Sequence, residues 1–139
     1  MEPIKFTRLN DLPESAARVR TEAAVDPSPL LGTWLSTNRA TRGIVKLVLS
    51  EAGGDFNVRA YGACEPSPVE WGPVVGATFA GGAGLASAVG FRAFYEFGFM
   101  QTTLAAYLNK RILVVDAYNT FKDGTGRRNY FSRDHFYQQ

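Results

Sequence analysis

Between Leu31 and Tyr137 the chain is a succession of short segments with strand character, separated by turn sequences and lacking any helical repeat. In many of these segments apolar residues alternate with polar ones, the two-residue period of a strand half-buried in a sheet. Glycine pairs, Asn109-Lys110 and Asp123-Gly124 favour tight turns between them. This pattern predicts about eight strands, at the spacing typical of an antiparallel up-and-down barrel. They are expected at residues 33–37, 43–50, 56–63, 74–80, 87–97, 99–108, 112–121 and 127–137.

The first 30 residues differ from the rest. Asp11-Leu12-Pro13-Glu14 resembles a helix start, and residues 15–24 are rich in Ala, Arg and Glu, so a short helix is expected before Pro27 and Pro29. We therefore predict an N-terminal leader at 1–30 and a single all-β barrel domain at 31–139. The leader is either a flexible segment or a helix that closes one end of the barrel.

Composition excludes several classes of partner. The formal net charge is only +2, too small to indicate a polyanionic partner. Cys64 is the single cysteine and has no internal disulfide partner. The stretch 72–91 carries no charge, but its many small residues favour two strands and a glycine turn over a membrane span. With no signal-peptide pattern at the start, we predict a cytoplasmic protein that binds no membrane.

Metal and nucleophile chemistry find no support in the sequence. His135 is the single histidine, so no cluster with metal-ligand spacing exists, and Cys64 is expected to be a small buried residue. The glycines around Ala83 lack the lysine and the strand-then-helix context of a phosphate loop. We predict no metal and no cofactor.

Basic and aromatic side chains interleave near the C-terminus, a pattern found in proteins that bind single-stranded nucleic acid. Strand alternation explains the pattern more simply, because it places these residues on two opposite faces. No nucleic-acid partner is therefore expected. The residues are Lys122, Arg127, Arg128, Tyr130, Phe131, Arg133, Phe136 and Tyr137.

One acidic residue lies among apolar neighbours. Asp116 shares a strand face with Ile112, Val114 and Tyr118, and a buried carboxyl without a partner has a raised pKa. That property suits a general acid or base, with Tyr118 as a second polar group. The alternative is a core ion pair in which a neighbouring strand neutralises Asp116. The catalytic candidates are Asp116, Tyr118 and, as a helper, Glu96.

Aromatic residues make up 13% of the chain, and large rings line apolar ligand pockets as well as cores. We therefore expect the barrel to hold a small, largely apolar organic molecule in its lumen. The alternative is a structural or interaction barrel with a packed interior. The candidate ligand-binding residues are Trp34, Tyr61, Trp71, Phe91, Arg92, Tyr95, Phe97 and Tyr107.

Gly32-Thr33-Trp34 precedes the first strand and resembles the Gly-X-Trp opening of the lipocalin and wider calycin families. That resemblance implies that Trp34 packs across the closed end of a calycin-like barrel. It also implies a cation–π contact between Trp34 and an arginine near the last strand, with Arg127, Arg128 and Arg133 as candidates.

A second resemblance, from Trp34 to Gly72, is to a bacterial family of small lipocalin-like domains of largely unassigned function. Its residues here are Asn38, Thr41-Arg42-Gly43-Ile44, Tyr61-Gly62, Cys64, Pro66 and Trp71-Gly72. Val69 and Glu70 replace the second cysteine and the aspartate common in that family, so no disulfide or two-thiol role is implied. The resemblance to small bacterial barrels also implies a sharper function, a cofactor-free cyclase or isomerase of natural-product (polyketide-type) biosynthesis. The alternative is a non-catalytic carrier.

Several strands are apolar on both faces, which a monomeric barrel in water does not need. Phe79, Phe94 and Val115 are therefore expected to contribute to a contact between two copies of the chain. A homodimer is predicted.

Overall fold

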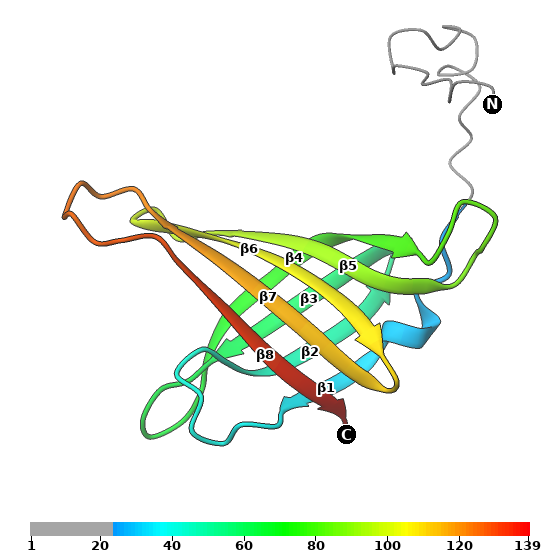
Figure 1. Ribbon diagram of the computed structural model, residues 1–139, viewed down its shortest axis with the longest axis horizontal. Coiled ribbons are helices and arrows are strands. Elements are labelled where there is room, and N and C mark those ends of the chain that lie inside the picture. Colours follow the sequence, from blue (N-terminus) through cyan, green and yellow to red (C-terminus); the bar gives the residue numbers. More distant parts are fainter. Residues whose placement is uncertain (1–23) are drawn as a thin grey trace, which may run out of the picture.

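The computed structural model describes residues 24–139, which form a closed barrel of eight antiparallel strands connected in sequence order (Figure 1). The predicted all-β, up-and-down barrel is confirmed. A 3-10 turn, η2 (Ser28–Leu30), leads into the first strand, and the helix expected within 15–24 lies almost entirely outside the described residues. The strands are β1 (Gly32–Ser36), β2 (Ile44–Ala52), β3 (Asp55–Gly62), β4 (Val69–Ala80), β5 (Ala88–Glu96), β6 (Met100–Asn109), β7 (Ile112–Phe121) and β8 (Tyr130–Gln138).

The strand boundaries follow the expected ones closely, with three differences, of which one is that β8 begins at Tyr130, three residues later than predicted. The β6–β7 turn uses Lys110 and Arg111, which adopt positive φ angles of 50° and 72°, whereas Asn109 ends β6. Strand β4 begins at Val69, five residues earlier than predicted, and it contains Pro73. Within the described residues no helix is long and apolar enough to cross a membrane.

Trp34 on β1 is almost fully buried near one end of the barrel, called here the closed end, where it packs in the core with Leu30 of η2. Its indole Nε1 donates a hydrogen bond of 2.8 Å to the carbonyl of Leu30 in η2, so the turn before β1 is fastened to the core. The expected arginine contact is wrong: in residues 24–139, Arg127 lies over Phe99 and Phe121, Arg133 lies over Phe131, and no arginine lies over Trp34. A backbone carbonyl is the polar partner of Trp34 instead.

A bulge in β4 explains its early start. Arg59 pairs with Pro73 and Tyr61 pairs with Glu70, so Ala60 on β3 lies opposite both Trp71 and Gly72. Such a bulge leaves backbone groups without a ladder partner. Gly72 has a φ of 91°, a conformation that favours glycine, and the strand continues beyond it to Val69.

The hydroxyl of Tyr95 on β5 fills this gap from inside the barrel. It accepts a hydrogen bond from the N–H of Ala60 at 3.0 Å, and it lies 2.9 Å from the carbonyl of Gly72 and 3.1 Å from that of Val58. Burial raises the pKa of the Tyr95 hydroxyl, so it stays protonated and keeps its donor. Tyr95 is thus a structural brace across the barrel and does not offer its hydroxyl to a ligand, contrary to expectation.

Candidate ligand-binding site

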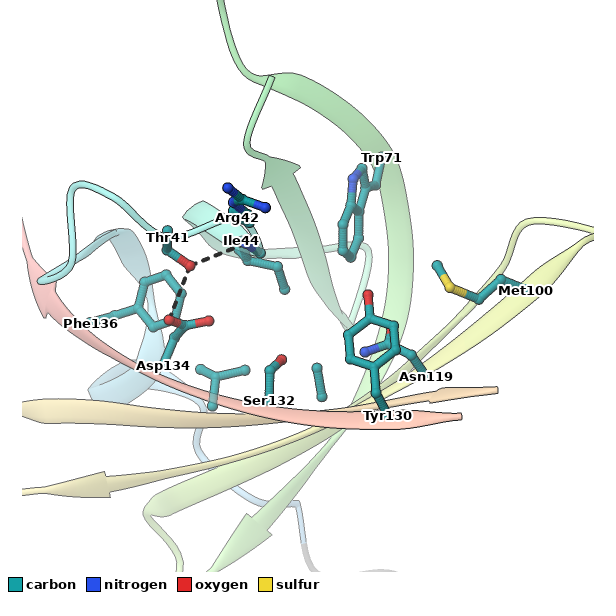
Figure 2. Close-up of a pocket in the computed structure, with 13 residues that line it drawn as sticks. Thr41, Arg42, Ile44, Trp71, Met100, Asn119, Tyr130, Ser132, Asp134 and Phe136 are labelled. Atoms are coloured by element: carbon teal, nitrogen blue, oxygen red, sulfur yellow. Dashed lines mark hydrogen bonds between the residues drawn. The ribbon is translucent and has the colours of Figure 1, made fainter. Parts of the chain in front are cut away.

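A cavity of about 290 Å³ lies at the end of the barrel opposite Trp34, called here the open end. The β1–β2 loop (37–43) and the first residues of β8 contribute to it, and Figure 2 shows side chains from several strands converging on one space. The lining residues are Thr41, Arg42, Gly43, Ile44, Trp71, Met100, Val115, Ala117, Asn119, Tyr130, Ser132, Asp134 and Phe136.

The apolar wall of the cavity includes Trp71, which the β4 bulge helps to place. The indole packs edge-on against Tyr95 and Phe97, with ring centroids 5.4 and 5.2 Å away. Gly62 on β3 permits this position, because a Cβ at that residue would lie 2.6 Å from the Trp71 Nε1. Two buried side chains of β7, Val115 and Ala117, form another part of the apolar wall.

The β1–β2 loop is joined to β8 by an acidic residue. The Thr41 hydroxyl donates a hydrogen bond of 3.2 Å to Asp134 Oδ1, and Thr41 Oγ1 accepts one of 3.1 Å from the Gly43 N–H (Figure 2). Within residues 24–139, neither Asp134 nor the nearby Arg42 forms a salt bridge. The cavity thus holds one carboxylate and one guanidinium that do not neutralise each other by direct contact.

The most buried polar group of the lining is Asn119 on β7, which is only 6% exposed. Its directly paired neighbour on β6 is Thr102, which is fully buried. The Thr102 hydroxyl donates a hydrogen bond of 2.6 Å to Asn119 Oδ1. The other side of the amide, the Nδ2 group, finds no acceptor among the described residues, and Figure 2 shows Asn119 beside Tyr130 at the edge of the cavity.

Asp116 does not face this cavity, and the expectation of an inward-facing acid with a raised pKa is wrong. Its neighbours Val115 and Ala117 line the cavity, so strand alternation places Asp116 on the outer surface. There it accepts hydrogen bonds of 2.6 and 2.9 Å from the Arg133 guanidinium, its cross-strand partner on β8. This pairing lowers the pKa of Asp116 despite its partial burial.

The other two catalytic candidates are also remote from the cavity lining. Tyr118 lies on the outer face of β7, 51% exposed, with its ring against Phe131. Glu96 is exposed at the end of β5, where a 2.6 Å ion pair with Lys122 lowers the pKa of its carboxyl. Neither Arg92 nor Glu96 pairs with Asp116. The structure therefore does not bring Asp116, Tyr118 and Glu96 together at one site.

Of the eight candidate ligand-binding residues, Trp71 alone lines the cavity. Trp34, Phe91 and Tyr95 are buried in the core, and Phe97 packs behind Trp71. The remaining three lie on the outer surface: Tyr61 lies beneath the Lys46 ammonium, Arg92 lies over Phe79, and Tyr107 is half-exposed. Cys64 is exposed as well, in the β3–β4 loop, contrary to expectation.

Sequence reasoning missed the polar part of the lining: Thr41, Arg42, Asn119, Tyr130, Ser132 and Asp134. A usable signal was present in β7, where Val115, Ala117 and Asn119 share a face that becomes more polar toward the C-terminal end of the strand. A similar pattern runs along Tyr130, Ser132 and Asp134 in β8. Small and polar residues on an inward face indicate an unfilled, polar end of a barrel.

Comparisons of this chain with protein-family models, curated proteins and solved structures find no match. Among residues 24–139, no three His, Cys, Asp or Glu side chains lie close enough to hold a metal ion. The case for function therefore depends on the open-end cavity.

Proposed function

We propose that this protein binds a small, largely apolar organic molecule in the open-end cavity of its barrel. The observation that carries the proposal is a space of about 290 Å³ that combines aromatic and aliphatic walls with six polar or charged lining side chains. Ligand sites commonly combine such walls with a small number of placed polar groups, which set the orientation of the ligand.

The volume limits the size of the ligand. Ligand pockets commonly measure about 300–1,000 Å³, and an apolar cavity of about 150 Å³ is enough to hold benzene. The open-end cavity therefore suits a molecule of one or two rings better than an extended polycycle. The interior toward Trp34 is packed with buried side chains, among them Leu47, Leu49 and Leu113.

Catalysis by a cofactor-free cyclase or isomerase is the second candidate, and Asp134 is the observation that favours it. Asp134 contributes the one carboxylate of the cavity lining, and one of its oxygens already accepts a hydrogen bond from Thr41. A proton transfer in this cavity would therefore use Asp134 as the acid or base. Asp116, bound to Arg133 on the outer surface, has no access to a substrate there.

We also propose a relationship to the calycin-type barrels and a location in the cell. The position of Gly32-Thr33-Trp34 at the start of β1, with the buried Trp34 bonded to the carbonyl of Leu30, supports a calycin-type relationship. We propose a cytoplasmic location because Cys64, the single cysteine, forms no disulfide within residues 24–139, and we propose no nucleic-acid partner because the net charge is small.

Ala117→Leu is expected to weaken ligand binding strongly by filling part of the cavity. The probe is indane, a two-ring hydrocarbon, titrated into ¹⁵N-labelled protein while amide shifts are followed by NMR. In the unchanged protein we expect shifts centred on Ile44, Trp71 and Ala117, and in the variant an affinity at least about tenfold lower, because the added carbons occupy the space of the ligand.

Ala105→Leu is the matched control. Ala105 lies on neighbouring β6, paired with Asp116 on the outer surface, so the same substitution adds the same volume away from the cavity. Binding of indane is expected to be unchanged in this variant. Equal binding by both variants, or shifts that avoid the cavity lining, would place the ligand elsewhere and overturn the proposal.

We also propose that two copies of the chain associate through the outer face of β5–β8. Phe94, Thr103, Tyr118 and Phe131 lie side by side across these four strands, and the three rings are each about half-exposed. Phe79 is exposed on adjacent β4, whereas Val115 is buried in the barrel and cannot take part, contrary to expectation.

The double substitution Phe94→Ser with Phe131→Ser is expected to convert a dimer into a monomer. The substitutions remove two apolar rings from the interface of each subunit. A two-fold axis would place both subunits' copies in the same contact, so four rings are lost in all. Light scattering after size-exclusion chromatography at micromolar concentration measures the mass. A monomeric mass for the unchanged protein would contradict the proposal.

A further inference from the structure

The orientation of the Asn119 side chain determines which kind of polar group the cavity offers. Asn119 Oδ1 is engaged by the Thr102 hydroxyl at 2.6 Å, and both residues are buried. The Nδ2 group therefore points away from Thr102, and its two N–H bonds find no acceptor among residues 24–139. Because Asn119 lines the cavity, these donors are available to a molecule inside it.

Thr102 makes the opposite orientation of the amide unfavourable. If the amide were turned over, Nδ2 would donate to Thr102 Oγ1, and the buried hydroxyl would need another acceptor for its own hydrogen. The described residues provide no other hydrogen bond to the Thr102 side chain. A buried hydroxyl without an acceptor is costly, so Thr102 holds the amide with its N–H groups toward the cavity.

We propose that Asn119 is the specificity-determining residue of the cavity and selects ligands that carry a carbonyl oxygen. Thr102 is the positioning residue that keeps the amide donors turned inward. This inference rests on the proposed ligand binding and adds the class of ligand: a compact apolar ring system with a carbonyl group on its edge. An acceptor oxygen satisfies the Nδ2 donors, whereas a hydrocarbon of the same shape leaves them unpaired.

The arrangement of the lining indicates where the carbonyl lies. Asn119 is paired with Tyr130 on β8, and Asp134 lies four residues further along the same strand, a separation of about 13 Å between backbone positions. Asn119 and Asp134 therefore mark two ends of the cavity, as Figure 2 shows. Ala117 lies between them on β7 and Val115 lies beside Asp134, so the apolar body of the ligand packs against these two side chains.

The test compares 1-indanone with indane, which have the same ring skeleton and differ in the carbonyl oxygen. In the unchanged protein we expect 1-indanone to bind about tenfold more tightly than indane, the effect of one well-placed buried hydrogen bond. The side-chain amide resonances of Asn119 are expected to shift with 1-indanone and to move much less with indane. Both ligands are titrated by NMR under identical conditions.

Two sets of variants assign the preference to this pair of residues. The double variant Asn119→Leu with Thr102→Val replaces both polar partners by apolar groups of similar shape, which preserves the fold better than either change alone. It is expected to bind the two ligands with equal affinity. Thr102→Val alone should reduce the preference for 1-indanone, and Thr102→Ser, which keeps the hydroxyl, should restore it.

The outcomes separate this inference from the proposed function. Equal affinities for 1-indanone and indane in the unchanged protein, with shifts at Ile44 and Trp71, would overturn carbonyl selection while supporting the cavity as a binding site. Retention of the preference in the double variant would also overturn the inference. Failure of both ligands to perturb the cavity lining would count against the proposed function itself.

Discussion

Trp34→Ala is expected to lower the free energy of unfolding by about 3–5 kcal/mol, the cost typical of truncating a large aromatic side chain in a packed core. Trp34 is 2% exposed and belongs to the buried cluster with Leu30 and Leu47. Its loss also leaves the carbonyl of Leu30 without the indole donor that holds η2 to β1. Because this loss is comparable to half or more of the stability of many domains, the variant should unfold at a much lower denaturant concentration.

Urea unfolding followed by circular dichroism measures the effect without depending on tryptophan fluorescence. Trp34→Phe separates the two contributions, since it keeps most of the ring and removes the Nε1 donor. Phe99→Ala is the matched surface control, because Phe99 is about half-exposed in the β5–β6 connection, outside the proposed dimer face. A loss in Trp34→Ala no larger than in Phe99→Ala would show that Trp34 does not anchor the closed end.

The number and order of strands could be predicted because each strand carries a local signal. Hairpin sequences such as Gly53-Gly54 and Asp123-Gly124 end the strands, and apolar residues recur with a period of two between them. These signals need no knowledge of distant residues. The start of β4 was predicted five residues too late because it depends on a distant residue: the bulge at Gly72 is held by the Tyr95 hydroxyl from β5.

The direction in which each strand face points could not be predicted from the same pattern. In β7 both faces contain large apolar residues, so the sequence alone does not say whether Val114 and Asp116 or Val115 and Ala117 face inward. The pairing of Asp116 with Arg133 on β8 decides it, and that register is a property of the closed barrel. An outward acid was therefore taken for an inward one, and Asn119 and Asp134 were missed.

Tyrosines presented a similar ambiguity, because a ring on a strand can belong to the core, the surface or a ligand site. Tyr107 and Tyr118 lie on the outer surface, whereas Tyr95 is buried with its hydroxyl fully used by β3 and β4. The strand face on which each ring lies distinguishes them, and that face is set by the register of the closed barrel. The hydroxyl of Tyr95 thus has a structural role that its neighbours along the sequence do not predict.

Tyr95→Phe is expected to lower the free energy of unfolding by about 1–3 kcal/mol, the cost of leaving buried polar groups without hydrogen bonds. The substitution keeps the ring stacked on Phe97 and removes the single atom that satisfies Ala60 N–H and contacts the Gly72 carbonyl. The loss should therefore come from the β3–β4 bulge alone. Urea unfolding gives its size, and hydrogen exchange of the Ala60 amide, expected to accelerate, gives its location.

Tyr118→Phe is the matched control, since it removes the same atom from a ring that is half-exposed on the outer surface. Its effect should remain within about 0.5 kcal/mol. Because the bulge helps to place Trp71, Tyr95→Phe should also weaken indane binding at the open end, whereas Tyr118→Phe should leave it unchanged. Similar stability and exchange rates in the two variants would mean that the bulge in β4 does not need the Tyr95 hydroxyl.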